Sequence, residues 1–256
     1  MKLGKVGLIG RFKPVHNGAA LMLETVCEKA ESVIIGIGSS NKYNARNPFL
    51  PEESEEMVRL VLEKFSNQKN PLVYSGNFLD EGNSSEFPAL KIKQIFSDLK
   101  LKPVSLQPNY KELNFNFRHY EILHVPDFSH ILQYSNGEKW KEYVCGQFGE
   151  LDNFVTSNDF VKELLKDRYN IIHPSELIPK EKQILLKATE VRLEMARFGN
   201  WKKLVPEKIS EYLEKNNLVS RFQNEFGLQT LALLSENLNL NETEDAAEEK
   251  LHAQEL

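Results

Sequence analysis

A run of basic and small residues near the N-terminus has the composition of a phosphate-binding loop. The run reads Gly10-Arg11-Phe12-Lys13-Pro14-Val15-His16-Asn17-Gly18. It connects a short β-like stretch, Lys5 to Phe12, to a helical pattern from Asn17 to Ala30. A loop that leads from a strand into a helix directs unpaired backbone N–H groups at its mouth, where the helix dipole also attracts anions. The segment is therefore a candidate site for a triphosphate.

Each residue type in this run has a physical task. Gly10 and Gly18 would let backbone and ligand approach closely, because they have no Cβ. Proline at position 14 stiffens the loop. For a single histidine at a helix start, a cap or a surface residue is the ordinary alternative. The side chains that could donate hydrogen bonds to phosphate oxygens are Arg11, Lys13 and His16.

The elements that must position this loop follow an α/β pattern. Ser32 to Ser40 is a continuous apolar run, as expected for a parallel strand covered on both faces, and Pro51 to Phe65 has helical spacing after a proline and glutamates. We therefore predict a doubly wound, Rossmann-like parallel sheet flanked by helices, with an insertion and a C-terminal helical region. The later expected strands are Tyr120 to Val125, Asn153 to Ser157 and Tyr169 to Ile172, and the later expected helices are Asn158 to Lys166, Thr189 to Phe198 and Pro206 to Lys215.

The sequence divides into five expected parts. Residues 1–66 would form the first half of the sheet domain and residues 119–200 the second half. Residues 67–118 are rich in Asn, Ser, Gly and Pro, with one helix-like stretch at Phe87 to Leu101, and are expected to be an insertion. C-terminal helices are expected at 201–236 and an acidic tail at 237–256.

Composition narrows the classes of partner and location. A formal net charge of −5 gives no basic excess for nucleic-acid binding. No apolar stretch is long enough to span a bilayer, and the chain reaches a strand pattern without a signal-peptide core, so we expect a cytoplasmic protein without membrane contact. Cys27 and Cys145 lack metal-type spacing, and Cys27 is expected to be a buried free thiol.

The N-terminal run resembles the nucleotidyltransferase superfamily, whose signature GRFxPxHxGH contains the HxGH box. Two further segments narrow the resemblance to archaeal-type nicotinamide-nucleotide adenylyltransferases. The first is Ile37-Gly38-Ser39-Ser40 followed by Arg46-Asn47-Pro48-Phe49, with Glu53 beyond it. The second is Thr189-Glu190-Val191-Arg192, which is similar to the family's SGTEVR motif and is followed by Met195, Trp201, Leu204, Val205 and Pro206.

The resemblance covers roughly the first 65 residues and about His119 to Phe226. Val125-Pro126-Asp127, Trp140 and Thr156-Ser157-Asn158 look like the family's central region, where an aromatic residue and an asparagine help to hold the nicotinamide nucleotide. For Trp140, core packing is the alternative to ring stacking.

The resemblance implies that the protein transfers an adenylyl group from ATP to nicotinamide or nicotinate mononucleotide. The products would be NAD, or its deamido form, and pyrophosphate, with Mg²⁺ entering with ATP. Catalysis would rest on alignment and charge stabilisation, without an enzyme nucleophile. The implied catalytic residues are His16, Arg46 and Arg192. The implied ATP contacts are Gly10, Arg11, Phe12, His16, Gly18, Thr189, Val191 and Arg192. The implied mononucleotide contacts are Ser39, Arg46, Trp140 and Asn158.

Two positions depart from the family pattern. Ala19 stands where HxGH has its second histidine, and loss of one preorganised donor typically costs about 10²–10³ in rate. Lys187-Ala188 replaces the usual Ser-Gly before Thr189. We hypothesise that Lys13 or Lys187 partly replaces the lost donor, with a solvated lysine as the alternative in each case.

The sequence is compatible with three functions. The first is the adenylyltransferase. The second is a nucleotide-binding regulatory protein that kept the phosphate site and lost turnover, because of Ala19. The third is a nucleotidyltransferase that uses CTP or another phosphorylated acceptor. A hydride-transferring Rossmann enzyme is disfavoured, since the opening lacks GxGxxG. A homo-oligomer is expected from the family.

Overall fold

The computed structural model describes residues 3–66, 119–129, 131–132 and 137–240. These residues belong to one compact unit. The expected insertion, with its helix-like stretch at Phe87 to Leu101, and all but the first four residues of the expected tail lie outside them.

A five-stranded parallel sheet forms the centre of this unit, in the order β3-β2-β1-β4-β5. The strands are β1 (Lys5–Gly10), β2 (Ser32–Gly38), β3 (His119–Val125), β4 (Asn153–Val155) and β5 (Asn170–Ile172). In the register of the central pair, Lys5 lies opposite Ser32 and Gly10 opposite Ile37. The expected doubly wound α/β fold is confirmed.

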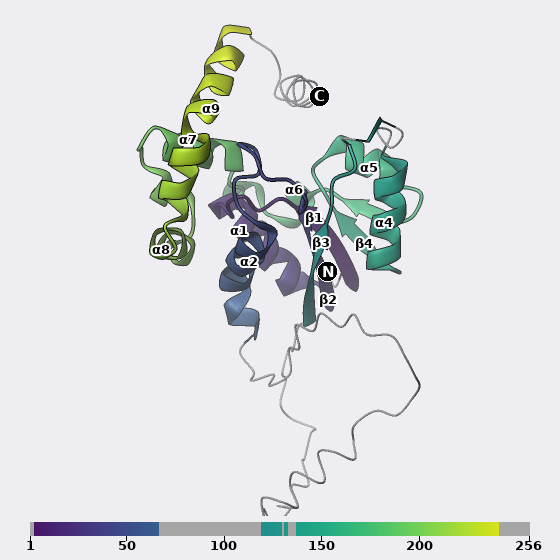
Figure 1. The fold of residues 1–256 in the computed structure, drawn as a ribbon. Helices are drawn as coiled ribbons and strands as arrows, with labels where there is room; N and C mark the ends of the chain where they lie inside the picture. The colour runs from purple at the N-terminus through teal and green to yellow at the C-terminus, as the bar shows by residue number, and fades with distance from the viewer. Residues whose placement is uncertain (1–2, 67–118, 130, 133–136, 241–256) are drawn as a thin grey trace, which may run out of the picture. The chain divides into compact units, whose positions relative to one another are not determined.

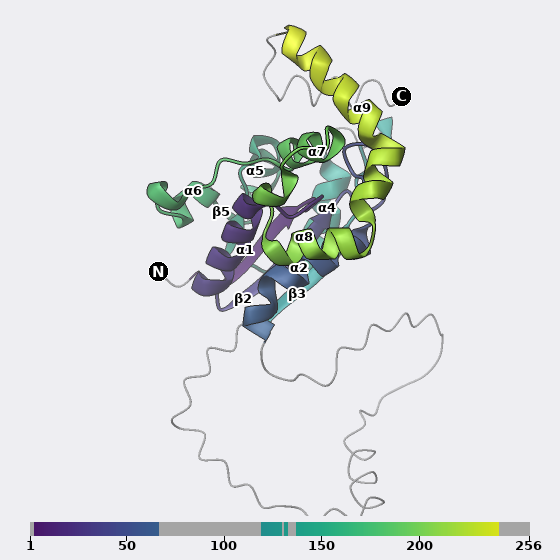
Figure 2. The same ribbon diagram turned by 90° about the vertical axis from the view of Figure 1, so that its left-hand side faces the viewer.

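Helices cover both faces of the sheet (Figure 1). On one face lie α1 (Asn17–Lys29) and α2 (Pro51–Ser66), and on the other lie α4 (Glu138–Phe148) and α5 (Asp159–Leu165). A short helix, α6 (Pro174–Leu177), and a 3₁₀ turn, η2 (Lys180–Lys182), follow β5. The C-terminal part consists of α7 (Ala188–Ala196), η3 (Trp201–Leu204), α8 (Glu207–Lys215) and α9 (Leu218–Leu240). Figure 2 shows α8 beside α2 and α9 beside α7.

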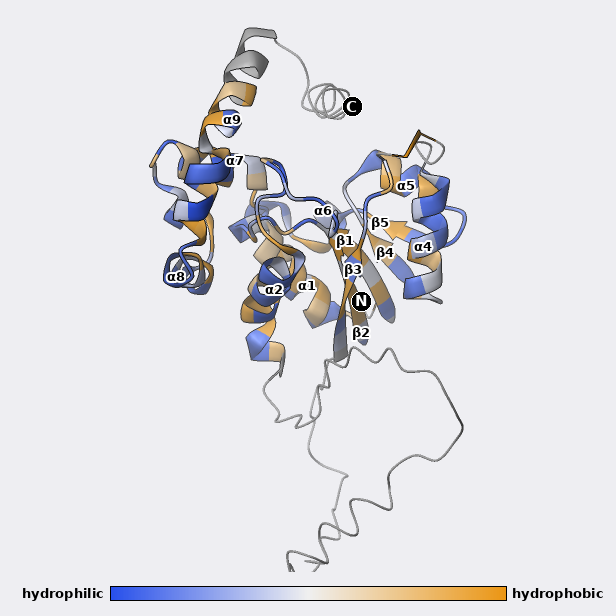
Figure 3. Ribbon diagram, in the orientation of Figure 1, coloured by the Kyte–Doolittle hydropathy of each residue, from blue (hydrophilic) through white to orange (hydrophobic). Residues whose placement is uncertain are grey.

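Successive side chains of each strand point to opposite faces of the sheet, because the strands are pleated. The buried side chains therefore divide between two apolar clusters. On β2, Val33, Ile35 and Ile37 join the larger cluster under α1 and α2, whereas Ile34 faces the smaller one under α4 and α5. The larger cluster continues through the buried faces of α7, α8 and α9. Figure 3 shows hydrophobic residues gathered along the central strands and hydrophilic ones on α8. Cys27 is buried and is not in a disulfide, as expected, and Cys145 is not in a disulfide either.

Several expected elements end earlier than the sequence pattern indicated. The first strand stops at Gly10, because Phe12 has φ 53° and cannot continue the extended backbone. The second stops at Gly38 for the same reason, since Ser39 has φ 50°. The helix expected to reach Phe198 ends at Ala196, and Phe198 itself has φ 57°.

Two helices of the structure have no separate counterpart among the helices expected from the sequence. The first, α4, begins after Gly137 and buries Val144 and Phe148, one turn apart. The second, α9, runs for 23 residues and continues to Leu240, past the expected start of the tail at 237. These two helices complete the coverage of the sheet and of α7, respectively.

Gly36 provides a test of the packing between the sheet and α4. A Cβ at this position would lie 2.7 Å from Ile9 Cγ1, 2.9 Å from Val125 Cγ2 and 3.1 Å from Phe148 Cζ. We predict that Gly36→Ala lowers the free energy of unfolding by about 1–3 kcal/mol, the usual cost of overpacking, in urea unfolding experiments. Gly146→Ala, in α4 with no atom within 4 Å of its Cβ, is the matched control and should raise stability by about 0.5–1 kcal/mol. Equal effects at the two glycines would contradict the packing described.

Candidate functional site

The strand order changes direction between β1 and β4. The chain builds outward from β1 through β2 to β3, and later returns to place β4 on the other side of β1. In open α/β sheets, ligands bind at such a switch point. The β1–α1 loop, Arg11 to His16, and the segment after β4, Thr156 to Asn158, both leave the sheet here.

Two glycines that flank the β1–α1 loop, Gly10 at the end of β1 and Gly18 in α1, are required by the packing of the protein itself. A Cβ on Gly10 would lie 2.7 Å from the ring of Phe12, which is buried. A Cβ on Gly18 would lie 2.7 Å from the carbonyl oxygen of Ile184. The sequence suggested close approach of a ligand as the reason for these glycines. The structure adds a second reason, which is contact with Phe12 and with the segment before α7.

Lys13 is fully buried at the base of this loop. Its Nζ donates a hydrogen bond to the carbonyl oxygen of Ser39 at 3.0 Å, which links the β1–α1 loop to the end of β2. Burial, and then the charges of Arg11 and Arg192, lower the pKa of Lys13 to about 8. The alternative of a solvated lysine is therefore wrong for position 13.

Arg192 joins α7 to the same loop. Its side chain is buried; Nη1 donates to the carbonyl oxygen of Lys13 at 2.9 Å and Nη2 donates to Thr189 Oγ1 at 3.1 Å. These surroundings differ from those of an arginine in a surface salt bridge. The beginning of α7 is thereby held beside the beginning of α1, and Val191, also buried, anchors α7 in the larger cluster.

His16 is the N-cap of α1. Its Nδ1 accepts a hydrogen bond from the backbone N–H of Ala19 at 3.2 Å. Burial, and then the charge of Arg192, lower the pKa of His16 to about 4, so the ring is neutral near pH 7. Because Nδ1 accepts, the proton of the neutral ring resides on Nε2, which makes His16 a neutral donor. The cap role and a donor role are thus compatible.

Arg46 and Lys187 both lie outside regular secondary structure. Arg46 occupies a turn closed by hydrogen bonds between Asn44 and Asn47, including Asn47 N to Asn44 O at 2.9 Å. Lys187 is exposed and precedes α7, where its N–H donates to Glu190 Oε1 at 2.9 Å. Ala188 begins that helix.

Trp140 and Asn158 lie on the α4–α5 side of the sheet. Trp140 is partly buried against the smaller apolar cluster, in agreement with the core-packing alternative. Asn158 is exposed and caps α5, its Oδ1 accepting from the N–H of Val161 at 3.1 Å. The structure thus brings Lys13 into contact with both Ser39 and Arg192, whereas Trp140 packs on the opposite face of the sheet from α1.

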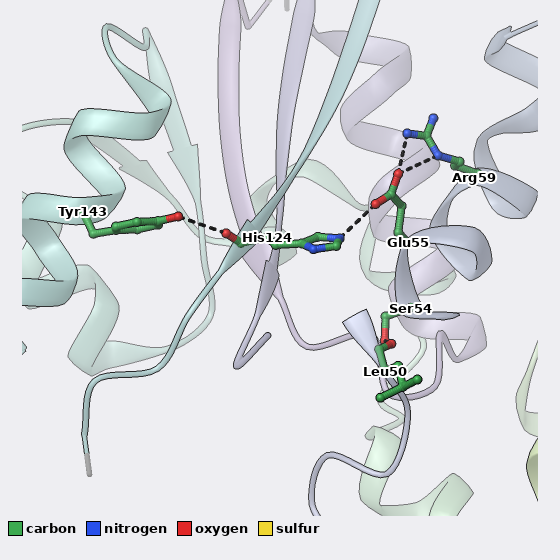
Figure 4. A network of polar contacts seen from close by, with 6 residues as sticks. All are labelled: Leu50, Ser54, Glu55, Arg59, His124 and Tyr143. Atoms are coloured by element: carbon green, nitrogen blue, oxygen red, sulfur yellow. Dashed lines mark hydrogen bonds and ion pairs between the residues drawn. The ribbon is translucent and has the colours of Figure 1, made fainter. Parts of the chain in front are cut away.

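A polar network that the sequence did not indicate connects β3 to the layers on either side (Figure 4). His124 Nε2 lies 2.9 Å from Glu55 Oε2, and Glu55 Oε1 accepts from Arg59 at 2.9 Å and 2.6 Å. From the other side, the hydroxyl of Tyr143 donates to the carbonyl oxygen of His124 at 3.3 Å. The one contact of this network that the sequence indicates is the Glu55–Arg59 pair, because residues four apart on a helix lie next to each other.

The arrangement suits a polyanion. Arg11, Lys13 and Arg192 are close enough for each arginine to depress the pKa of the lysine, which means that their charges repel one another without a ligand. Phosphate groups would relieve this repulsion, and the amino ends of α1 and α7 add further N–H donors. Among the described residues, no three His, Cys, Asp or Glu side chains gather as a metal site would require. None of the helices in this part of the chain is long and apolar enough to cross a membrane.

The pKa of His16 predicts an acid-sensitive stability. Between pH 6.5 and about 4 the unfolded chain binds a proton at this ring that the folded chain excludes, so the free energy of unfolding falls as the pH drops through this window. Each unit of pKa difference corresponds to about 1.4 kcal/mol. His16→Asn keeps a capping acceptor but cannot titrate, so it should lose less stability than the parent between pH 7.5 and pH 5. Parallel pH curves in urea unfolding would refute this assignment.

Comparisons with known proteins agree with this architecture. The family model described as cytidylyltransferase-like matches residues 8–85. The nicotinamide-nucleotide adenylyltransferase of Thermococcus kodakarensis is 24% identical over 92% of this chain and 91% of its own length. The protein of the same name from Thermococcus sibiricus is 27% identical over 92% of both chains.

A solved structure shares the fold. The bifunctional NMN adenylyltransferase/ADP ribose pyrophosphatase from Francisella tularensis matches 94% of this chain with a TM-score of 0.52 and 14% identity. This chain spans 57% of the length of that bifunctional protein. The chain is thus similar over nearly its whole length to archaeal proteins named nicotinamide-nucleotide adenylyltransferase, and residues 8–85 match the cytidylyltransferase-like family model. The solved structure shows that the fold is shared.

Proposed function

We propose that the protein transfers the adenylyl group of ATP to nicotinamide or nicotinate mononucleotide. An oxygen of the mononucleotide's 5′-phosphate attacks the α-phosphorus of ATP and forms the new P–O bond. The bond from the α-phosphorus to the bridging oxygen of the β-phosphate breaks, and pyrophosphate leaves with the electron pair. The products are NAD, or its deamido form, and pyrophosphate. No covalent bond to the protein is needed.

The observation that carries this proposal is the cationic cluster around the β1–α1 loop. Arg11 and Arg192 would bind the ATP phosphates. The positive charges of both arginines act on the amine of Lys13, although Arg192 is distant from Lys13 in the sequence. His16 would donate from neutral Nε2 to the α-phosphate, where negative charge develops. Alignment of two anions supplies much of the rate in such a transfer, so fixed donors matter more than a base.

The ATP contacts expected from the resemblance fall on two neighbouring segments. Gly10, Phe12 and Gly18 belong to the β1–α1 segment, which follows the strand at the switch point. Thr189 and Val191 belong to the first turns of α7, which Arg192 joins to that segment. These positions support a triphosphate placed between the amino ends of α1 and α7.

For the mononucleotide, we propose contacts from the ends of β2 and β4. Ser39 follows β2, Arg46 occupies the next turn, and Asn158 follows β4 across the switch point. Arg46 would bind the phosphate of the mononucleotide or the charge of the transition state. Trp140, which is partly buried on α4, would stack on the nicotinamide ring.

Magnesium would enter with ATP. Mg²⁺ is usually bound through substrate phosphates together with waters and one or two carboxylates. The charges of the carboxylates Glu52 and Glu53 act on the amine of Lys13. Both oxygens of Glu53 pair with Arg221, so Glu52 is the one of the two that would hold the ion. When bound, the ion would neutralise charge on the phosphates and on the leaving pyrophosphate. The protein's own part is to hold the phosphates with its cations.

The two lysines suggested as replacements for the missing histidine have different surroundings. Lys13 is buried and hydrogen-bonded to Ser39, so it would act as a fixed charge behind the phosphates and as a support for the loop. Lys187 is exposed next to the first turn of α7, where it could reach a triphosphate. We therefore assign any direct compensation to Lys187. The homo-oligomeric state, the cytoplasmic location and the absence of nucleic-acid binding stay predictions.

A turnover assay with an Ala19→His variant tests the reaction and the meaning of Ala19 together. Purified protein with Mg-ATP and each mononucleotide should form dinucleotide and pyrophosphate in equal amounts. We expect Ala19→His to raise kcat by up to about 10²-fold, because it restores a donor at the transferring phosphate. Lys187→Ala in the parent should lower kcat, and should matter less beside His at position 19. ATP binding without any turnover in either protein would favour a regulatory nucleotide-binding protein, and turnover with CTP alone would favour another transferase.

Proton uptake on ATP binding offers an independent check of the phosphate site. The pKa of Lys13 is about 8 without ligand, and a neighbouring triphosphate must raise it. At pH 8 the binding of ATP should therefore take up a fraction of a proton, measured by titration calorimetry in two buffers of different ionisation enthalpy. The uptake should disappear in Lys13→Met and persist in Lys187→Ala. Equal proton uptake in Lys13→Met and the parent would place the triphosphate elsewhere.

A further inference from the structure

The C-terminal helix α9 holds the turn that contains Arg46. Arg221, in the first turn of α9, forms a two-pronged ion pair with Glu53 of α2, with Nη1 2.7 Å from Oε1 and Nη2 2.6 Å from Oε2. Both side chains are largely shielded, with exposed fractions of 28% and 16%. Paired, planar contacts of this kind fix position as well as charge.

The same guanidinium contacts both ends of the Arg46 turn. Nη2 lies 3.3 Å from the carbonyl oxygen of Pro48, which it reaches as a donor, and the guanidinium carbon lies 5.8 Å from the centre of the Tyr43 ring. Tyr43 and Pro48 flank the turn closed by Asn44 and Asn47. Movement of Arg221 would therefore shift both ends of the segment that presents Arg46.

Further contacts seat this segment on α9 and α2. The ring of Tyr43 meets that of Phe226 edge to face, with centroids 5.1 Å apart, and its hydroxyl bonds Glu225. Buried Phe49 lies against Phe222, with centroids 6.5 Å apart. Glu53 also accepts the N–H of Leu50 at 2.9 Å, so the carboxylate that Arg221 binds closes the first turn of α2.

We infer that Arg221 is a positioning residue for Arg46, acting through its contacts with Glu53, Pro48 and Tyr43. This inference rests on the proposed function only in assigning Arg46 to the mononucleotide or the transition state. In this arrangement, α9 is part of the construction of the mononucleotide side of the site, although Arg221 itself contacts no substrate. A misplacement of about 1 Å at a reacting group can cost about 10²-fold in rate.

The first test needs no ligand. Arg221→Met should increase amide hydrogen exchange in residues 43–50 of the full-length protein and leave exchange in the β1–α1 loop unchanged. Lys208→Met is the matched control, because it breaks an exposed ion pair between α8 and Glu63 of the same helix α2. It should leave residues 43–50 unchanged. Unchanged exchange in Arg221→Met, or an increase spread over the whole chain, would overturn the inference whatever the protein catalyses.

The second test is a double-mutant cycle between Arg221→Met and Arg46→Ala, measured as kcat/KM for the mononucleotide and as its dissociation constant. In the parent, Arg221→Met should lower kcat/KM by roughly 10-fold or more, with the dissociation constant of ATP unchanged, and Arg221→Lys should recover part of the loss. In the Arg46→Ala background the loss should disappear, because Arg221 acts through Arg46. Equal losses in both backgrounds would overturn the inference. If the parent neither binds nor converts a mononucleotide, the proposed function fails, and the exchange experiment alone decides the role of Arg221.

Discussion

The buried hydrogen-bond chain through Lys13 is the interaction on which the rest of the site depends. Its amine is bonded to the carbonyl of Ser39, and its own carbonyl receives the guanidinium of Arg192. One residue therefore ties the loop after β1 to the end of β2 and to α7, which arrives 179 residues later in the sequence. Burying a positively charged amine costs free energy unless the amine is hydrogen-bonded and its charge is paired with an opposite charge. In this fold, the charge lies behind the proposed phosphate site, where it would attract the ligand, and the bonds fix the loop that would form that site.

The β1–α1 loop can hold His16 without further repulsion among its positive charges, because the ring of His16 is neutral. With Arg11, Lys13 and Arg192 already close together, a charged imidazole would have raised the cost of the unliganded state. Burial and Arg192 keep His16 neutral, and the cap on Ala19 fixes its tautomer. The ring then offers one oriented donor to an anion. Ala19 contributes its backbone N–H to this arrangement, and its methyl group, which has no donor, is partly buried.

The regular parts of the fold could be predicted because their patterns are local. The segments around β1, α1 and β2 carry continuous apolar runs and helical spacing, and they were placed within a few residues. The ends of the strands could not be predicted, because the left-handed backbone at Phe12 and Ser39 is set by loop packing. The family motifs identified the candidate residues at the loop and at α7. The sequence did not indicate that Lys13 is buried, nor that Arg221 pairs with Glu53, because each contact joins segments distant in sequence.

The pairing of Arg221 with Glu53 has a consequence for the order in which the protein is made. These residues are 168 positions apart, so Glu53 leaves the ribosome long before its partner exists. The nascent chain can form β1, α1 and β2 early, since their contacts are local. It cannot fix the turn around Arg46 until α9 has emerged and docked, because contacts between distant segments must wait for both. The turn around Arg46 thus matures later than the β1–α1 loop, whose distant partner Arg192 lies before α9, and a nascent chain arrested before α9 would carry that loop with the turn still unfixed.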